Sequence, residues 1–192
     1  MGTIMIIFGA IVLVILLILY WLYASLITKR NRALEALSGI DVQLKKRHDL
    51  LPNILTIAKK FMEHEKDVLT RVTEMRNLAG RSYDPSNPDE VGKHLEAEKG
   101  FQSAMMQLFA VAENYPDLKS QHNMIEAQQA YEEVEGHISA ARRFYNSSVT
   151  DLNNAVQIFP SSAVAGMIGI RAMPYFEMDE AEKKPVDAAE FL

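Results

Sequence analysis

The first 28 residues form one unbroken hydrophobic segment. No charged side chain occurs from Met1 to Thr28, and Ile4 to Ile27 is almost entirely isoleucine, leucine, valine and aromatic residues. About 20 apolar residues in an α-helix cross the roughly 30 Å hydrocarbon core of a bilayer. The segment is therefore predicted to be a single transmembrane anchor, residues 1–28, that contacts the lipid bilayer through residues 4–27.

A cleavable signal peptide is the main alternative for this segment. Signal peptides have a basic n-region and an apolar core of 7–15 residues, whereas here only Met-Gly-Thr precedes an apolar run about twice that long. Tyr20, Trp21 and Tyr23 cluster near the end of the run, where amphipathic aromatic rings favour the headgroup level. We therefore expect the anchor to be retained.

Beyond Lys29, apolar residues recur every three or four positions, which is the pattern of amphipathic α-helices. Glycine and proline divide the pattern into three long segments, residues 31–79, 88–114 and 117–159. Pro52 lies inside the first segment and predicts a kink there.

Two further signals concern where helices begin. Asn87 before Pro88 is typical of an N-cap followed by proline at the first helical position. After Pro160, the apolar sequence PSSAVAGMIGI is predicted to form a short additional helix.

The expected fold class is all-α, with a single N-terminal transmembrane helix followed by an antiparallel, four-helix-bundle-like domain. This domain, residues 29–176, would contain three long helices, the first kinked near Pro52, and the short C-terminal helix. Residues 177–192 are acidic and predicted to be a flexible tail. At 1.5 Å per residue the three long segments measure about 74, 40 and 64 Å. A reversal at Pro52 would drive the last helix into the membrane, so residues 31–79 are expected to form one continuous helix.

The segment from Phe159 to Phe176 is rich in apolar residues but too short to span a membrane. It could cap the bundle, lie on a bilayer or contact a neighbouring subunit. The length arithmetic places Phe159 at the far tip, distant from the membrane. It therefore favours capping, with Ile168 and Phe176 as the tail contacts.

The distribution of charge bears on orientation and partners. Lys29, Arg30 and Arg32 follow the anchor, and no basic residue precedes it. This asymmetry places the N-terminus outside and the domain in the cytoplasm of a single-pass cell-membrane protein. The same three residues could contact anionic headgroups. The net charge of −5 argues against a nucleic-acid partner.

The sequence contains no recognisable catalytic or metal-binding pattern. Di-iron helix bundles use Glu-x-x-His, but none of the five histidines has a glutamate three residues before it. The chain has no cysteine, which excludes cysteine nucleophiles, and no glycine-rich phosphate loop is evident. We expect no enzyme activity, no cofactor and no metal.

The polar stretch RHDLLPN is the main candidate for a site. Asp41 and His48 are seven residues apart and therefore lie on one helix face, with Arg47 and Asn53 flanking them. These four residues could form a surface that recognises a partner or lipid headgroups. Alternatively they form a satisfied polar layer that fixes helix register beside Pro52, where freed backbone carbonyls need donors. The second interpretation is favoured.

Four stretches of the chain resemble the LemA family of bacterial membrane-anchored proteins. They are IDVQLKKRHDLLPNI (40–54), HEKDVLTRVTEMR (64–76), ARRFYNSSVTDLNNAVQIFPSS (141–162) and PYFE (174–177). The resemblance implies one N-terminal span and an all-α, bundle-like domain, but it supplies no activity. The sequence IGIRAMPYF departs from the family's usual aromatic residue and basic-proline pair, which concerns tail packing alone.

Two classes of function follow from these observations. The first is a membrane-anchored, non-enzymatic interaction or scaffold protein that self-associates or binds other membrane proteins. The alternative is an enzyme accessory or adaptor, for example to a membrane protease in an envelope stress response. A deep pocket lined by several of the four candidate polar residues would favour the alternative.

Overall fold

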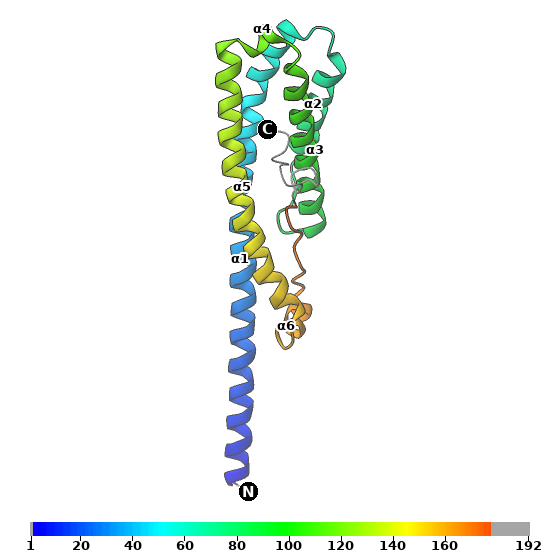
Figure 1. Ribbon diagram of the computed structural model, residues 1–192. Coiled ribbons are helices and arrows are strands. Elements are labelled where there is room, and N and C mark those ends of the chain that lie inside the picture. Colours follow the sequence, from blue (N-terminus) through cyan, green and yellow to red (C-terminus); the bar gives the residue numbers. More distant parts are fainter. Residues whose placement is uncertain (1, 178–192) are drawn as a thin grey trace, which may run out of the picture.

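The computed structural model describes residues 2–177, which form six helices and no strand (Figure 1). The helices are α1 (Gly2–Phe61), α2 (Lys66–Ala79), α3 (Pro88–Ala112), α4 (Pro116–Lys119), α5 (His122–Gln157) and α6 (Ser161–Ile168). The predicted all-α class is confirmed. The predicted acidic tail lies outside the described residues, apart from Glu177.

Helix α1 joins the apolar N-terminal segment to the bundle without interruption. It is the one described helix that is long and apolar enough to cross a membrane. Every residue from Gly2 to Trp21 is exposed, and burial against the rest of the chain begins at Leu22. Pro52 lies within the helix and does not end it. The hydroxyl of Thr56 donates a 2.7 Å hydrogen bond to the Pro52 carbonyl one turn earlier.

The prediction that residues 31–79 form one helix is wrong. Helix α1 ends at Phe61, and α2 begins at Lys66 after a short turn that contains neither glycine nor proline. Met62 is fully buried in the turn, and its carbonyl accepts a 3.1 Å hydrogen bond from the Glu65 amide. The chain therefore reverses at this point because of tertiary packing, not because of a helix-breaking residue.

This reversal changes the direction of every later helix. The chain runs along α1 to the far end, back along α2, out again along α3, and returns along α5 beside α1 (Figure 1). Helix α5 packs mainly on α1, and α2 packs mainly on α3. The end of α5 and all of α6 therefore lie at the end of the bundle nearest the N-terminus. The prediction that Phe159 lies at the far tip is wrong for the same reason.

Local signals at helix ends agree better with the sequence. The side chain of Asn87 accepts a 3.1 Å hydrogen bond from the Asp89 amide, with Pro88 at the start of α3. The short C-terminal helix is present as α6. Gly169 follows it with φ 71°, in the left-handed region that favours glycine. The predicted N-cap and the predicted fourth helix are both confirmed.

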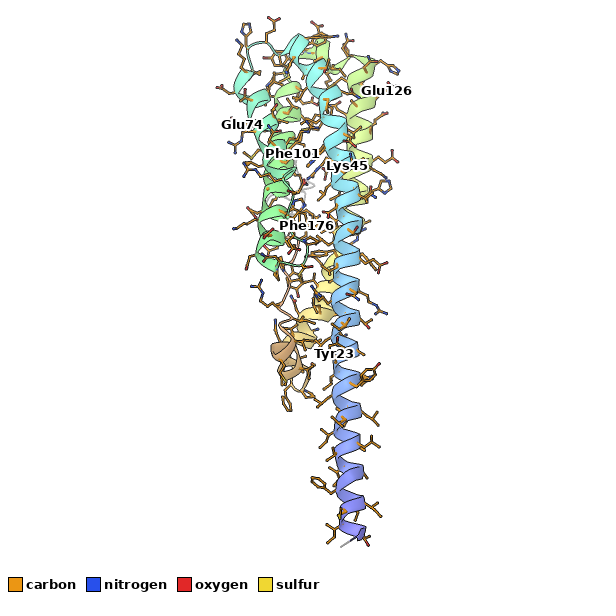
Figure 2. All side chains as sticks on the ribbon, turned by 180° about the vertical axis from the view of Figure 1, so that it is seen from behind. Tyr23, Lys45, Glu74, Phe101, Glu126 and Phe176 are labelled. Atoms are coloured by element: carbon orange, nitrogen blue, oxygen red, sulfur yellow. The ribbon has the colours of Figure 1, made fainter. Side chains whose placement is uncertain are left out.

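Three hydrophobic clusters are stacked along the length of the molecule. The far cluster, around Ile54 and Phe101, joins α1, α2, α3 and α5. The middle cluster, around Leu37 and Tyr145, includes Phe176 of the segment after α6. The third consists of Leu22 and Leu26 of α1 with Val164 and Ala165 of α6. Figure 2 accordingly shows Tyr23 at the level of α6.

Candidate functional site

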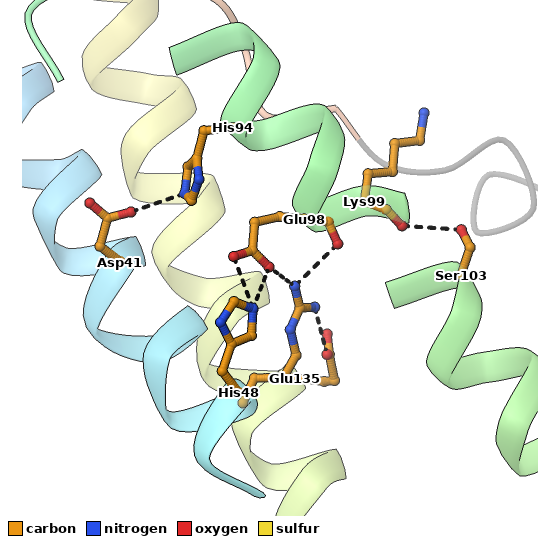
Figure 3. Close-up of polar contacts among 8 residues, drawn as sticks. Asp41, His48, His94, Glu98, Lys99, Ser103 and Glu135 are labelled. Carbon is orange, nitrogen blue, oxygen red and sulfur yellow. Dashed lines mark hydrogen bonds and ion pairs between the residues drawn. The ribbon is translucent and has the colours of Figure 1, made fainter. Parts of the chain in front are cut away.

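A buried arginine lies at the centre of the bundle and joins three helices. Arg47 of α1 is 1% exposed. One terminal nitrogen donates to the Glu98 carboxylate of α3 at 2.5 Å and to the Glu98 backbone carbonyl at 3.2 Å. The other donates to the Glu135 carboxylate of α5 at 2.9 Å (Figure 3). Arg47 therefore connects the α1–α5 pair to the α2–α3 pair.

His48 completes this group, which we call the Arg47 cluster: Arg47, His48, Glu98 and Glu135. The His48 ring nitrogen Nε2 lies 3.1 and 3.2 Å from the two Glu98 carboxylate oxygens (Figure 3). The Phe101 ring forms the apolar side of the cluster: the His48 ring meets it edge-on at 5.0 Å, and the Arg47 guanidinium lies 5.2 Å from its centre.

The charges of the cluster stabilise one another in a buried setting. Burial alone would raise the pKa of Glu98, but the hydrogen bond with His48 and the Arg47 charge outweigh burial and lower this pKa. Burial would lower the pKa of Arg47, but nearby acidic groups, with Glu135 and Glu98 among them, raise it. Both side chains are therefore held in their charged forms. Removing one partner of a buried pair of this kind is strongly destabilising, because it leaves an uncompensated buried charge.

We expect the Glu98 carboxylate to make stability depend on pH in the acidic range. Because the folded-state pKa of Glu98 lies below the unfolded value, its contribution is present above the ordinary pKa of 4.5 and is lost as pH falls through the folded value. Urea unfolding of the full chain and of Glu98→Gln, followed by far-UV circular dichroism, tests this. The variant should be the less stable at pH 7, and the gap should narrow below about pH 4.5. A gap that does not change with pH would contradict the assignment.

Asp41 belongs to a second polar group that also joins α1 to α3. The Tyr83 hydroxyl donates a 2.8 Å hydrogen bond to the Asp41 carboxylate, and burial raises the pKa of Tyr83. The His94 ring nitrogen lies 3.4 Å from the other Asp41 oxygen (Figure 3). The Tyr83 and His94 rings stack 4.1 Å apart. A hollow of about 300 Å³ lies on the outer side of this ring pair.

The four candidate residues therefore do not form one surface. Asp41 and His48 both contact α3, as their seven-residue spacing predicts, but each has its own partners. Arg47 lies inside the bundle. Asn53 is exposed and borders an open groove between α1 and α5, beside Asn123 and apart from the other three. No deep pocket in the described part of the chain is lined by several of the four.

A polar layer lies between the helices, but its hydrogen-bond donors contact acceptors other than the predicted ones. We expected donors to satisfy backbone carbonyls near Pro52. The bonded nitrogens of Arg47 instead donate to Glu98 and Glu135 on neighbouring helices.

Sequence reasoning did not identify Glu98, Glu135, Tyr83 and His94. One signal was available for Glu98. It lies seven residues after Val91 and seven before Met105, on the apolar stripe of α3. A carboxylate at a core position is rarely buried without a partner, so it should point to a buried cation on another helix.

A second set of polar contacts holds the extended segment 170–176 against α5. The Asn153 side chain donates to the Met173 carbonyl at 2.9 Å and accepts from the Met173 amide at 2.8 Å. Asn146 makes the same two contacts with Phe176, at 3.0 and 2.9 Å. The Tyr145 hydroxyl donates to the Pro174 carbonyl at 2.8 Å. We call this set the tail clamp.

The two predicted tail contacts have different environments. Phe176 is 4% exposed in the middle cluster, and the Arg142 guanidinium lies 5.8 Å from its ring centre. Ile168 is 38% exposed at the end of α6. Phe176 therefore packs on the chain's own bundle, whereas Ile168 lies at the end nearest the N-terminus.

The arrangement supports structural roles more readily than chemical ones. Within residues 2–177, no group of three histidine, aspartate or glutamate side chains is arranged to hold a metal ion. The charged residues of the Arg47 cluster contact one another, and Phe101 packs against Arg47 and His48. The cluster thereby joins α1, α3 and α5.

In this protein, an apolar helix that could cross a bilayer continues unbroken into a helical bundle. This combination defines the class of membrane-associated all-α proteins. Within this class the chain belongs to the LemA family, whose family model matches residues 36–190. It is 24% identical to Protein LemA of Metamycoplasma hominis over 90% of this chain and 78% of that protein. It is also 20% identical to Magnetosome protein MamQ of Magnetospirillum gryphiswaldense, over 85% of this chain and 68% of that protein. Magnetosome protein MamQ 2 of Paramagnetospirillum magneticum is 22% identical over the same shares. The predicted family is confirmed.

Proposed function

We propose that this protein is a single-pass, non-enzymatic scaffold that holds a helical surface at a fixed distance from the membrane for other membrane proteins or for copies of itself. The observation that supports this most directly is the continuity of α1. A flexible linker would leave the distance between the domain and the membrane variable. An unbroken helix fixes this distance and the orientation of the domain relative to the anchor. From Leu22 to Phe61 the helix rises about 60 Å.

The non-enzymatic part of the proposal draws on the polar side chains within residues 2–177. Arg47, His48 and Glu98, which could bind or transfer protons, are engaged with one another inside the bundle. By contrast, apolar side chains are exposed on three helices. Val42 on α1 is 54% exposed, Met106 on α3 is 50% exposed, and Phe144 on α5 is 64% exposed. Singly exposed apolar side chains are common on protein surfaces, so these three positions are the points at which contact with a partner is to be tested.

Photo-crosslinking in intact membranes tests the scaffold proposal. A photoreactive residue would replace Val42, Met106 or Phe144 in turn, with the exposed polar positions Glu35 and Gln107 as controls. We expect one or two of the apolar positions to give a discrete crosslinked species, either a homodimer or one membrane protein, and the controls to give none. Equal, diffuse crosslinking at all positions would contradict a defined interaction surface.

We further propose that the N-terminus lies outside and the bundle in the cytoplasm, because basic residues follow the anchor and none precedes it. Ser86 and Ser120 are exposed, and the chain has no cysteine. In Ser86→Cys and Ser120→Cys variants, the thiols should resist an impermeant maleimide in whole cells and react after the cells are opened. Rapid labelling in whole cells would reverse the orientation.

Contact between anionic headgroups and Lys29, Arg30 or Arg32 is also part of the proposal. These residues lie within three turns after the apolar segment, where a basic side chain adds about 1 kcal/mol of attraction to an anionic surface. They would help to hold α1 at a constant depth.

A further inference from the structure

Helices α5 and α6 form a hairpin, and its tip, Ile158 to Ile168, lies at the level where the membrane span must end. The exposed apolar part of α1, Gly2 to Trp21, rises about 30 Å, which is the thickness of the hydrocarbon core. The next residue, Leu22, is already covered, and the chain that covers it is α6. A bilayer that surrounds the exposed part of α1 therefore reaches α6.

Aromatic residues mark the same level. Tyr20 and Trp21 are 70% and 68% exposed, and Tyr23 is 45% exposed. Tyrosine and tryptophan favour the boundary between headgroups and hydrocarbon. Tyr23 lies beside α6 in Figure 2 and borders a hollow of about 360 Å³ with Ile168. The anchor's aromatic belt and α6 thus occupy one layer.

The hairpin tip has the composition of a membrane-contacting segment. No charged residue occurs between Asp151 and Arg171. Four large apolar side chains project from this stretch: Ile158, Phe159, Met167 and Ile168, with exposed fractions of 60, 80, 86 and 38%. Clustered at one end of a water-soluble domain, they would be an aggregation hazard. Beside a membrane anchor, the hydrocarbon region of the bilayer is close enough to cover these side chains.

Basic residues lie where lipid phosphates would be. Arg30 of α1 and Arg171, which follows α6, border the hollow that contains Tyr23 and Ile168. Arg171 also pairs with Asp89 at 3.1 Å and contacts Asn87, so part of its hydrogen-bonding capacity is used within the protein. The order along the molecule is therefore the exposed apolar part of α1, then one layer that holds the aromatic belt and α6, then basic side chains. That order matches the profile of a bilayer surface.

We propose that the α5–α6 tip, Ile158 to Ile168, inserts into the headgroup–hydrocarbon boundary of the phospholipid bilayer that holds the anchor. This inference rests on the proposed membrane span of α1. The bundle is then attached at two points, the anchor and the tip. The second attachment restricts the tilt of α1 in the membrane and the rotation of the bundle about α1, which the anchor by itself leaves free. The tip lies in the interface and does not cross it.

The test uses the full-length chain, since its lack of cysteine allows a single environment-sensitive fluorophore at any position. Phe159→Cys and Met167→Cys report on the tip. Phe144→Cys is the matched control: an exposed phenylalanine of α5, about 20 Å along the helix axis from Gln157, where α5 ends just before the tip. Leu13→Cys reports on the anchor independently. Because all four side chains are exposed, the substitutions remove little packing.

Each labelled protein is placed as a single copy in nanodiscs of phosphatidylcholine with a minor share of phosphatidylglycerol. Emission maximum and quenching by iodide are then measured. We expect the two tip probes to be blue-shifted and roughly tenfold less accessible to iodide than the Phe144 probe. A tip as accessible as Phe144, with Leu13 shielded, would overturn the tip proposal and leave the anchor intact. An accessible Leu13 would instead overturn the span. Tip shielding that appears only with two copies per nanodisc would also overturn the proposal, in favour of a contact between subunits.

Discussion

Replacing Arg47 by methionine is expected to lower the free energy of unfolding by about 3–5 kcal/mol. The substitution keeps much of the side-chain volume but removes the guanidinium that donates to both Glu98 and Glu135. Glu98 is 1% exposed and cannot regain its water shell unless the bundle opens. Urea unfolding of the full chain in detergent, followed by far-UV circular dichroism at pH 7, measures the loss.

Lys45→Met is the matched control for this substitution. Lys45 lies on the same helix, two residues earlier, and pairs with Asp49 at 3.0 Å on the surface, where both side chains are largely exposed. Exposed pairs of this spacing contribute about 0.3–0.5 kcal/mol. If Arg47→Met lowered stability no more than Lys45→Met, the Arg47 cluster would not hold the bundle together.

A double substitution separates the cost of a broken pair from the value of the intact one. Removing one member of a buried pair leaves an uncompensated charge, whereas replacing both members with apolar side chains is often close to neutral. Arg47→Met combined with Glu98→Leu should therefore be more stable than Arg47→Met alone. If the double variant is the less stable of the two, the Glu98 charge that Arg47→Met leaves behind is not the source of that variant's loss.

Much of the fold was readable from local patterns. Asn87 and Pro88 predict the start of α3 because an asparagine side chain can cap the first free amides and proline needs no donor there. The apolar run from Ile4 to Ile27 predicts the exposed N-terminal third of α1, Gly2 to Trp21, in the same direct way. Each of these features is encoded within a few adjacent residues.

The turn after Phe61 was not readable in that way. It contains no glycine or proline, and its residues are compatible with a helix. The reversal depends on the burial of the Met62 side chain and on the packing of α2 along α3. Both involve contacts between distant parts of the chain. Because this turn was not predicted, α5 was expected to run in the opposite direction. Its C-terminal end was therefore expected at the far end of the bundle, whereas it lies at the end nearest the N-terminus.

The candidate site shows the same division. The seven-residue spacing of Asp41 and His48 predicts that both lie on one face of α1, and in the structure both contact α3. The partners Glu98 and Glu135 are 51 and 88 residues from Arg47 in sequence. No local pattern pairs them, and only the arrangement of α1, α3 and α5 brings the three side chains together.

The tail clamp leads to the second large effect. In Asn153→Ala the Met173 amide and carbonyl lose their partners while still buried beside α5. An unsatisfied buried polar group costs about 1–3 kcal/mol, so the two together should destabilise the clamped segment by about 2–6 kcal/mol. The segment can escape this cost by detaching from α5, since water then satisfies both groups. We therefore expect local release of residues 170–176 before the bundle unfolds.

Hydrogen exchange of the full chain in detergent distinguishes local release from global loss. In Asn153→Ala, amide exchange at Met173 and Phe176 should accelerate strongly, whereas amides in the middle of α3 should keep their protection. Asn154→Ala is the control, because this neighbouring residue is exposed and its substitution should leave both regions unchanged. Unchanged exchange at Met173 would show that packing of Phe176, not the Asn153 side chain, holds the segment. Equal acceleration in α3 would show instead that the clamp is part of the cooperative bundle, and that release of the segment and unfolding are one event.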